Sequence, residues 1–140
     1  IFISVADRDK HQVILPVRRL WQLGYEILAT SGTAAILNRH GIPNRIVRKH
    51  SADDNAPAGP SIVDLILAGE VDVVVNTPSG TDARKDGYEI RAATTAADAP
   101  IFTTIAQLSA AIGSFETVIA GPFKVRSLQE HAEDRRVAIA

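Results

Sequence analysis

The sequence predicts an α/β domain built on one parallel β-sheet with helices on both faces. Segments typical of strands alternate with segments typical of helices along all 140 residues, and this alternation is characteristic of a parallel sheet. Residues 71–75 contain four valines, as expected of a central strand that is covered on both faces. No linker or internal repeat divides the chain, so we predict a single domain over residues 1–140.

The first strand and helix follow from the opening residues. Residues 1–6 form an apolar, β-rich run that predicts a strand, and 7–10 form a charged turn. Apolar residues then recur near a spacing of 3.6 at Val13, Val17, Leu20 and Trp21. Gly24 is a C-terminal stop for this helix, which must either start near Leu15 or bend at Pro16. We place the Trp21 ring in the core.

The next two predicted strands cover residues 25–29 and 45–48, and a predicted helix over 32–40 lies between them. Gly41 closes that helix. The segment 51–60 combines two prolines and a glycine with Asp and Asn, and this composition predicts an irregular loop.

The second half repeats the alternation. Its predicted helices cover residues 62–69, 89–97, 105–112 and 127–135, and its predicted strands cover 71–75 and 100–103. Residues 81–86 are expected to be a loop, and Gly121-Pro122 a turn. The last helix begins with Ser127, and Glu130 three residues later completes a capping box.

Composition and charge exclude several classes of function. The chain is 46% hydrophobic with a net charge of −1, which argues against a general nucleic-acid or membrane-surface role. There is no cysteine, the four histidines lack metal-ligand spacing, and no apolar run approaches the ~20 residues of a membrane span. We expect a cytoplasmic protein. The chain contains no methionine and opens on a strand-like run, so we also expect a piece of a longer protein.

The turn Ala-Thr-Ser-Gly-Thr-Ala at 29–34 joins the second predicted strand to its helix. Such a turn presents unpaired N–H groups at the positive end of a helix. Thr30, Ser31 and Thr33 add short hydroxyl donors, and Gly32 lacks the Cβ that would hold an anion away. We predict a phosphate or carboxylate site here. The alternative is an ordinary loop in which Ser31 or Thr33 caps the helix.

Two other predicted strands also end in polar segments. Residues 7–10 follow the first strand and 76–80 follow the fourth. In open parallel sheets, ligands bind at the carboxyl ends of the strands, near the point where strand order reverses. The three polar segments therefore favour one common site at that edge.

Five motifs share a register with a known family. They are S-V-A-D-R-D-K at 4–10, A-T-S-G-T-A at 29–34, V-R-K-H at 47–50, V-N-T-P-S-G at 75–80 and D-G-Y-E-I-R at 86–91. Their order and spacing resemble the methylglyoxal-synthase-like (MGS-like) domain and, more closely, the C-terminal regulatory domain of bacterial carbamoyl-phosphate synthase large chains. V-R-S-L-Q-E at 125–130 extends the resemblance almost to the end. It implies a Rossmann-like, three-layer fold with a five-stranded parallel sheet in the order 3-2-1-4-5.

The resemblance also implies a site for a nucleotide effector. In bacterial members UMP inhibits, whereas IMP and ornithine activate. The implied effector and phosphate site consists of Lys10, Thr30, Ser31, Gly32, Thr33, Lys49, Asn76, Thr77, Ser79, Gly80 and Asp86. Asp86 either orients a ribose hydroxyl or caps the following helix. Thr103 falls on an ornithine contact, although Ile101 replaces the family's tyrosine.

The resemblance implies partners and an absence of catalysis in this domain. The parent ligase uses ATP with Mg or Mn, whereas this domain needs no cofactor and binds neither nucleic acid nor membrane. Its partners would be the other domains of the large chain and, through them, a glutaminase small chain. Pro78 and Gly87 replace residues that contact the ribose and base in the family, so the resemblance does not by itself identify UMP as the effector.

Two alternatives remain. Methylglyoxal synthase is similar in fold and phosphate site, but this chain has Ala6 and Ala83 where that enzyme has histidines, and no acid at 59–62. Its chemistry requires a base and an electrophile. The other alternative is a protein-interaction domain without a small ligand, because a fold alone does not fix a function.

Overall fold

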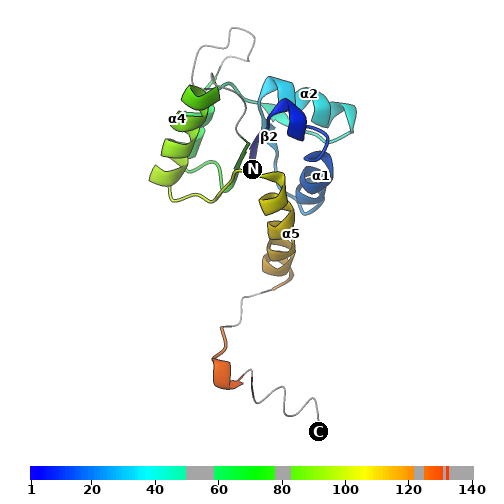
Figure 1. The fold of residues 1–140 in the computed structure, drawn as a ribbon, viewed down its shortest axis with the longest axis vertical. Coiled ribbons are helices and arrows are strands. Elements are labelled where there is room, and N and C mark those ends of the chain that lie inside the picture. Colours follow the sequence, from blue (N-terminus) through cyan, green and yellow to red (C-terminus); the bar gives the residue numbers. More distant parts are fainter. Residues whose placement is uncertain (50–58, 78–82, 122–124, 131, 133–140) are drawn as a thin grey trace.

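Five short strands form one parallel sheet at the centre of the domain (Figure 1). The computed structural model describes residues 1–49, 59–77, 83–121, 125–130 and 132. The strands are β1 (Phe2–Ser4), β2 (Leu28–Ala29), β3 (Arg45–Ile46), β4 (Val74–Asn76) and β5 (Ile101–Phe102). Their spatial order is β3-β2-β1-β4-β5, which confirms the expected topology. Strand order reverses between β1 and β4, where Ser4 is in register with Asn76.

Helices cover both faces of the sheet. They are η1 (Asp7–Asp9, a 3₁₀ turn), α1 (Ile14–Gln22), α2 (Ser31–Arg39), α3 (Ile62–Leu67), α4 (Ala83–Ala96) and α5 (Ile105–Ala120). Figure 1 shows α4 on one side of the strands and α1 and α2 on the other. The α3 and α4 helices pack against each other, and so do α1 and α5.

Each face of the sheet has its own apolar core because strand side chains alternate in direction. Phe2, Leu28 and Val74 belong to the core under α3 and α4. Their chain neighbours Ile3, Ala29 and Val75 belong to the core under α1, α2 and α5. The last strand positions therefore fall on known faces, and these positions carry the polar residues considered below.

Several predicted helix boundaries are confirmed. The α1 helix begins at Ile14 and holds Pro16 in its first turn, where a missing N–H costs nothing. Gly24, Gly41 and Gly69 each follow a helix with positive φ, at 96°, 68° and 73°, a conformation that glycine adopts without steric cost.

The beginning of the last predicted helix is also confirmed. Ser127 and Glu130 form the expected capping box, with the Ser127 N–H donating to Glu130 Oε2 at 2.6 Å and the Glu130 N–H to Ser127 Oγ at 3.2 Å. Residues 128–130 and 132 are helical. The predicted loop at 51–60 lies, up to residue 58, outside the described residues.

Two helices are longer than predicted, and each continues through a glycine. The predicted loop over 81–86 is wrong from Ala83 onward, where α4 begins and continues through Gly87. The α5 helix likewise continues through Gly113 to Ala120. Glycine costs only about 1 kcal/mol inside a helix, and burial of Ile90 in α4 outweighs that cost.

The strands are shorter than predicted, and one core assignment is wrong. β4 ends on Asn76, which the sequence had suggested would begin the following turn. Trp21 is 39% exposed rather than in the core. The buried stripe of α1 runs through Val17 and Leu20, and Trp21 falls beside that stripe because successive helix residues are about 100° apart.

Candidate functional site

The beginning of α2 is an uncapped helix N-terminus at the carboxyl end of β2. Thr30 is the N-cap residue, with φ −69° and ψ 154°, and its side chain makes no capping hydrogen bond. The alternative in which Ser31 or Thr33 caps the helix is therefore wrong, since both lie inside the first turn. Ser31 and Gly32 are exposed, so their backbone N–H groups can donate to an anion.

The Lys10 ammonium lies directly beside this helix end. A Cβ placed on Gly32 would come within 3.2 Å of Lys10 Nζ. A cation at the positive end of a helix dipole is unfavourable unless negative charge accompanies it. Asp7 Oδ1 supplies part of that charge at 2.7 Å from Lys10 Nζ, yet its side chain is 94% exposed. A bound anion at this position would interact favourably with both the ammonium and the helix end.

The Lys10 ammonium lowers the pKa of Asp7 below its ordinary value, chiefly through their hydrogen bond and then through charge attraction. Asp7 therefore remains ionised, and competes for Lys10, throughout the neutral pH range.

A row of polar side chains crosses the carboxyl edge of the sheet on the α3–α4 face. Thr30, Ser4 and Asn76 each lie two residues beyond an apolar residue of that core; Thr30 directly follows β2, Ser4 ends β1 and Asn76 ends β4. They are 8%, 7% and 6% exposed. Thr30 Oγ1 lies 3.5 Å from Ser4 Oγ, which joins the first two. Buried hydroxyl and amide groups at the strand-order switch point are the arrangement expected where a polar ligand binds.

Asn76 is the most informative member of this row. Its Nδ2 group is buried and has no hydrogen-bond partner among the described residues. An unsatisfied buried donor typically costs about 1–3 kcal/mol, so such a group needs an explanation. A ligand acceptor at this position would satisfy it.

Two predicted ligand contacts are already used by the fold. Thr77 Oγ1 accepts the Ala6 N–H at 2.8 Å, and Thr33 Oγ1 accepts the Val5 N–H at 3.3 Å. Both threonines are at least nine-tenths buried. They hold the segment between β1 and Lys10 in place, which gives them a positioning role.

The structure says less about the remaining predicted site residues. Lys49 is half-buried and follows Arg48, which bridges to Ser61 at the start of α3. Ser79 and Gly80 lie outside the described residues. Asp86 lies inside α4, so its predicted role as cap of a helix starting at residue 89 is wrong.

Thr103 is not brought to this site. Its N–H and hydroxyl both point to Gln107 Oε1, at 3.0 and 3.3 Å, at the beginning of α5. β5 lies three strand spacings from β2, or roughly 14 Å. Any contact to Thr103 therefore belongs to a different place on this edge.

Sequence reasoning missed Ser4 and Arg91 as members of the site. The signal for Ser4 was available, because it lies two residues after buried Phe2 and so falls on the same face. Arg91 lies near Asn76, because a Cβ placed on Gly87 would be within 3.5 Å of both Arg91 Nη1 and Asn76 Nδ2. That proximity depends on how α4 packs against β4, which sequence spacing does not give.

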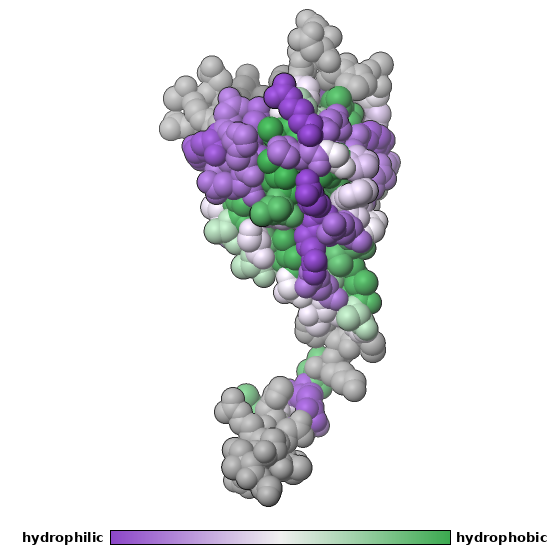
Figure 2. All heavy atoms as spheres, turned by 90° about the vertical axis from the view of Figure 1, so that its right-hand side faces the viewer, coloured by the Kyte–Doolittle hydropathy of each residue, from purple (hydrophilic) through white to green (hydrophobic). Residues whose placement is uncertain are grey.

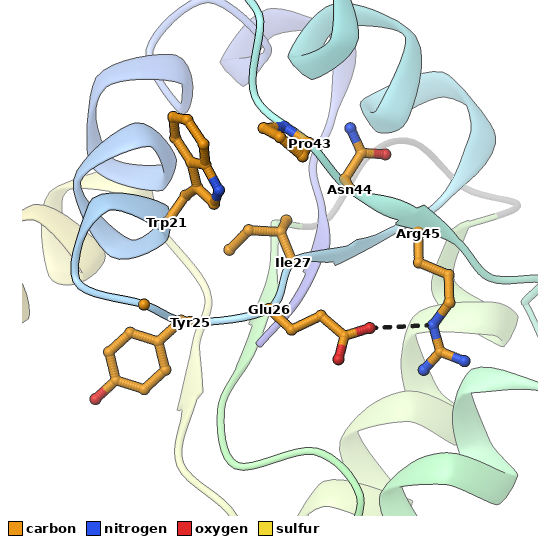
Figure 3. A pocket seen from close by; sticks show the side chains of 8 residues that line it. Trp21, Tyr25, Glu26, Ile27, Pro43, Asn44 and Arg45 are labelled. Atoms are coloured by element: carbon orange, nitrogen blue, oxygen red, sulfur yellow. Dashed lines mark ion pairs between the residues drawn. The ribbon is translucent and has the colours of Figure 1, made fainter.

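A separate cavity lies at the opposite, amino edge of the sheet (Figure 3). Its volume is about 430 Å³, and its lining includes Trp21, Tyr25, Glu26, Ile27, Pro43, Asn44 and Arg45. Its two charged residues pair with each other, with Arg45 Nε 3.4 Å from Glu26 Oε1. It contains none of the predicted site residues, and it explains the partial exposure of Trp21.

The described ranges contain neither a metal-binding cluster nor a membrane-spanning helix. Within them, no group of three His, Asp or Glu side chains could hold a metal ion. In the same ranges, no helix has the length and apolar character needed to cross a membrane.

Comparisons with known proteins place this geometry in context. The family model described as "MGS-like domain" matches residues 12–103. The chain is 64% identical over 132 residues to the carbamoyl phosphate synthase large chain of Clavibacter sepedonicus, covering 94% of this chain and 12% of that protein. The same named protein of Beutenbergia cavernae is 59% identical, and that of Streptomyces avermitilis 51%, with the same coverage. The chain thus spans 12% of the length of these relatives.

Proposed function

The chain belongs to the MGS-like domain family, and on that premise we propose that it binds a small phosphorylated effector at the carboxyl edge of its sheet. The effector class is a nucleoside monophosphate or a similar anion. The observation that carries this proposal is the Lys10 ammonium beside the uncapped beginning of α2, next to the buried polar row. Ammonium, oriented N–H groups and hydroxyls are the groups that bind phosphate.

The proposed consequence is regulation of a larger enzyme. The relatives are named carbamoyl phosphate synthase large chain, and we propose that this chain is the regulatory portion of such a ligase. It would perform no chemistry itself and need no cofactor, while ATP and Mg or Mn would act in the other domains. Regulation requires an effector whose affinity differs between the enzyme's conformational states.

The exposed part of α5 supports contact with other domains of such a chain. Its 16 residues include one charged residue, Glu116, and Figure 1 shows the helix projecting beyond the layered body. Val118 and Ile119 are 57% and 52% exposed. Figure 2, which faces the side of α1 and α2, shows hydrophobic atoms reaching the surface between polar ones. A nearly uncharged helix is typically covered on most sides, so the remaining domains and, through them, a glutaminase small chain are the proposed partners.

Thermal unfolding with added ligands tests the proposal. We expect phosphate to raise the midpoint and UMP or IMP to raise it further, because a ligand that binds only the folded state stabilises it by mass action. At 100 times the dissociation constant, the rise should be roughly 5–10 °C. Two controls accompany these ligands: ornithine, which has no phosphate, and buffer alone at the same ionic strength, without sulfate because sulfate could occupy an anion site. If none of the phosphorylated ligands moves the midpoint, the interaction-domain alternative is favoured.

Asp7→Asn should tighten phosphate binding about two- to fivefold, because the variant removes the carboxylate that competes for Lys10. An exposed ion pair is worth ~0.2–1 kcal/mol, which sets this range. Isothermal titration measures the change. Asp72→Asn removes the same charge from an exposed residue at the opposite edge of the sheet and should leave the affinity unchanged. Equal or weaker binding by Asp7→Asn would show that Lys10 does not hold the anion.

A further inference from the structure

The unpartnered Asn76 amide has a second donor beside it on α4. A Cβ placed on Gly87 would lie 2.9 Å from Arg91 Nη1 and 3.5 Å from Asn76 Nδ2. Both nitrogens therefore lie within 3.5 Å of one point, and the missing side chain of Gly87 is what leaves the guanidinium that room. Any larger residue at position 87 would displace Arg91 from the amide.

These two groups offer donors without an acceptor between them. Asn76 Nδ2 has no hydrogen-bond partner among the described residues, and guanidinium is a donor with a permanent positive charge. Within the ranges that the structure describes, no carboxylate forms an ion pair with Arg91. The planar fork of arginine suits the two oxygens of a carboxylate or phosphate.

This pair of donors is separated from the Lys10 end of the site. Asn76 ends β4, Thr30 follows β2, and β1 lies between those strands. Two strand spacings are on the order of 10 Å. One small anion cannot span that distance, whereas a ligand of five or six carbons with an acidic group at each end can.

We propose that Arg91 and Asn76 form a second anion-binding point, so that among the phosphorylated ligands of this site one with a second, distal acidic group binds more tightly than one with a single phosphate. A phosphate binds at Lys10 and the beginning of α2, and a carboxylate or second phosphate binds at Arg91. The inference rests on the proposed function, because it assumes the Lys10 anchor. It makes Arg91 a specificity-determining residue.

Matched ligand pairs test this inference by isothermal titration. Sorbitol 6-phosphate is compared with 6-phosphogluconate, and fructose 6-phosphate with fructose 1,6-bisphosphate, since each pair differs by one distal acidic group. In the unmodified protein, the second acid should tighten binding at least about tenfold, as one charge-assisted hydrogen bond to a guanidinium does. The carboxylate and phosphate arms distinguish the two kinds of distal group.

Arg91→Gln should abolish this gain while leaving the affinity for inorganic phosphate unchanged. Gly87→Ser should reduce the gain as well, since its side chain displaces the guanidinium. Arg39→Gln, at the exposed far end of α2, is the matched control and should keep the full gain. Thermal midpoints of all three variants check that they fold.

The outcomes separate this inference from the proposed function. Phosphate binding without any gain from a distal acid would overturn the second anchor and leave the Lys10 site standing. A gain that persists in Arg91→Gln would assign the distal group to other residues and overturn the role of Arg91. No binding of phosphate or of any of the four sugar phosphates would overturn both proposals.

Discussion

Lys10→Glu should abolish phosphate binding without destabilising the fold. Loss of one charge-assisted hydrogen bond weakens binding by about 10- to 100-fold, and charge reversal adds repulsion, so the loss should exceed about 100-fold. Isothermal titration with phosphate and with UMP measures it. The same substitution places a carboxylate beside the beginning of α2, where negative charge is favourable by ~0.3–1 kcal/mol. This gain offsets the exposed ion pair with Asp7 that the variant loses, worth ~0.2–1 kcal/mol, so the ligand-free thermal midpoint should stay about level.

A loss of binding without a loss of stability makes the result specific. A variant that loses binding because it is partly unfolded would show a lower midpoint, not an equal or higher one. Arg39→Glu is the control for net charge, because it makes the same reversal at the exposed C-terminal end of α2. Lys49→Glu should also weaken binding if Lys49 belongs to the anchor. Unchanged binding by both lysine variants would remove the phosphate site from this edge.

The architecture could be predicted because local patterns and the resemblance agreed. Alternating apolar strands and amphipathic helices define the α/β class, and the resemblance supplied the order β3-β2-β1-β4-β5. Boundaries at Gly87 and Gly113 could not be predicted, because the decision to continue a helix through glycine depends on packing against the sheet. Trp21 shows the same limit, since its exposure depends on how α1 is rotated about its own axis against the sheet.

The sequence predicted which residues gather at the candidate site better than it predicted the role of each residue there. The turn at 29–34 and Lys10 follow from strand-turn-helix reasoning together with the family's motifs, and the structure brings them together. The structure also shows which hydroxyls the fold already uses, since Thr33 and Thr77 accept backbone N–H groups. No sequence spacing distinguishes those threonines from Thr30, because the difference lies in which loop approaches each hydroxyl.

The double variant Thr33→Val/Thr77→Val should lower the free energy of unfolding by roughly 2–6 kcal/mol, although valine matches threonine in shape. Each substitution leaves one buried backbone N–H, of Val5 or Ala6, without its acceptor, and each such loss typically costs about 1–3 kcal/mol. Because total stability is only ~5–15 kcal/mol, this is a large fraction. Urea unfolding followed by circular dichroism measures the change.

Two comparisons identify the cause of that loss. Thr33→Ser/Thr77→Ser keeps both hydroxyl acceptors and should retain more than half of the stability that the valine variant loses. Thr117→Val removes a threonine hydroxyl that donates to a carbonyl on the exposed part of α5, and it should cost under about 0.5 kcal/mol. Since Val5 and Ala6 lead directly to the Lys10 turn, the valine variant should also bind phosphate more weakly while it is still folded. A stable double variant would mean that water satisfies both N–H groups, and that the two threonines are free to contact the ligand directly.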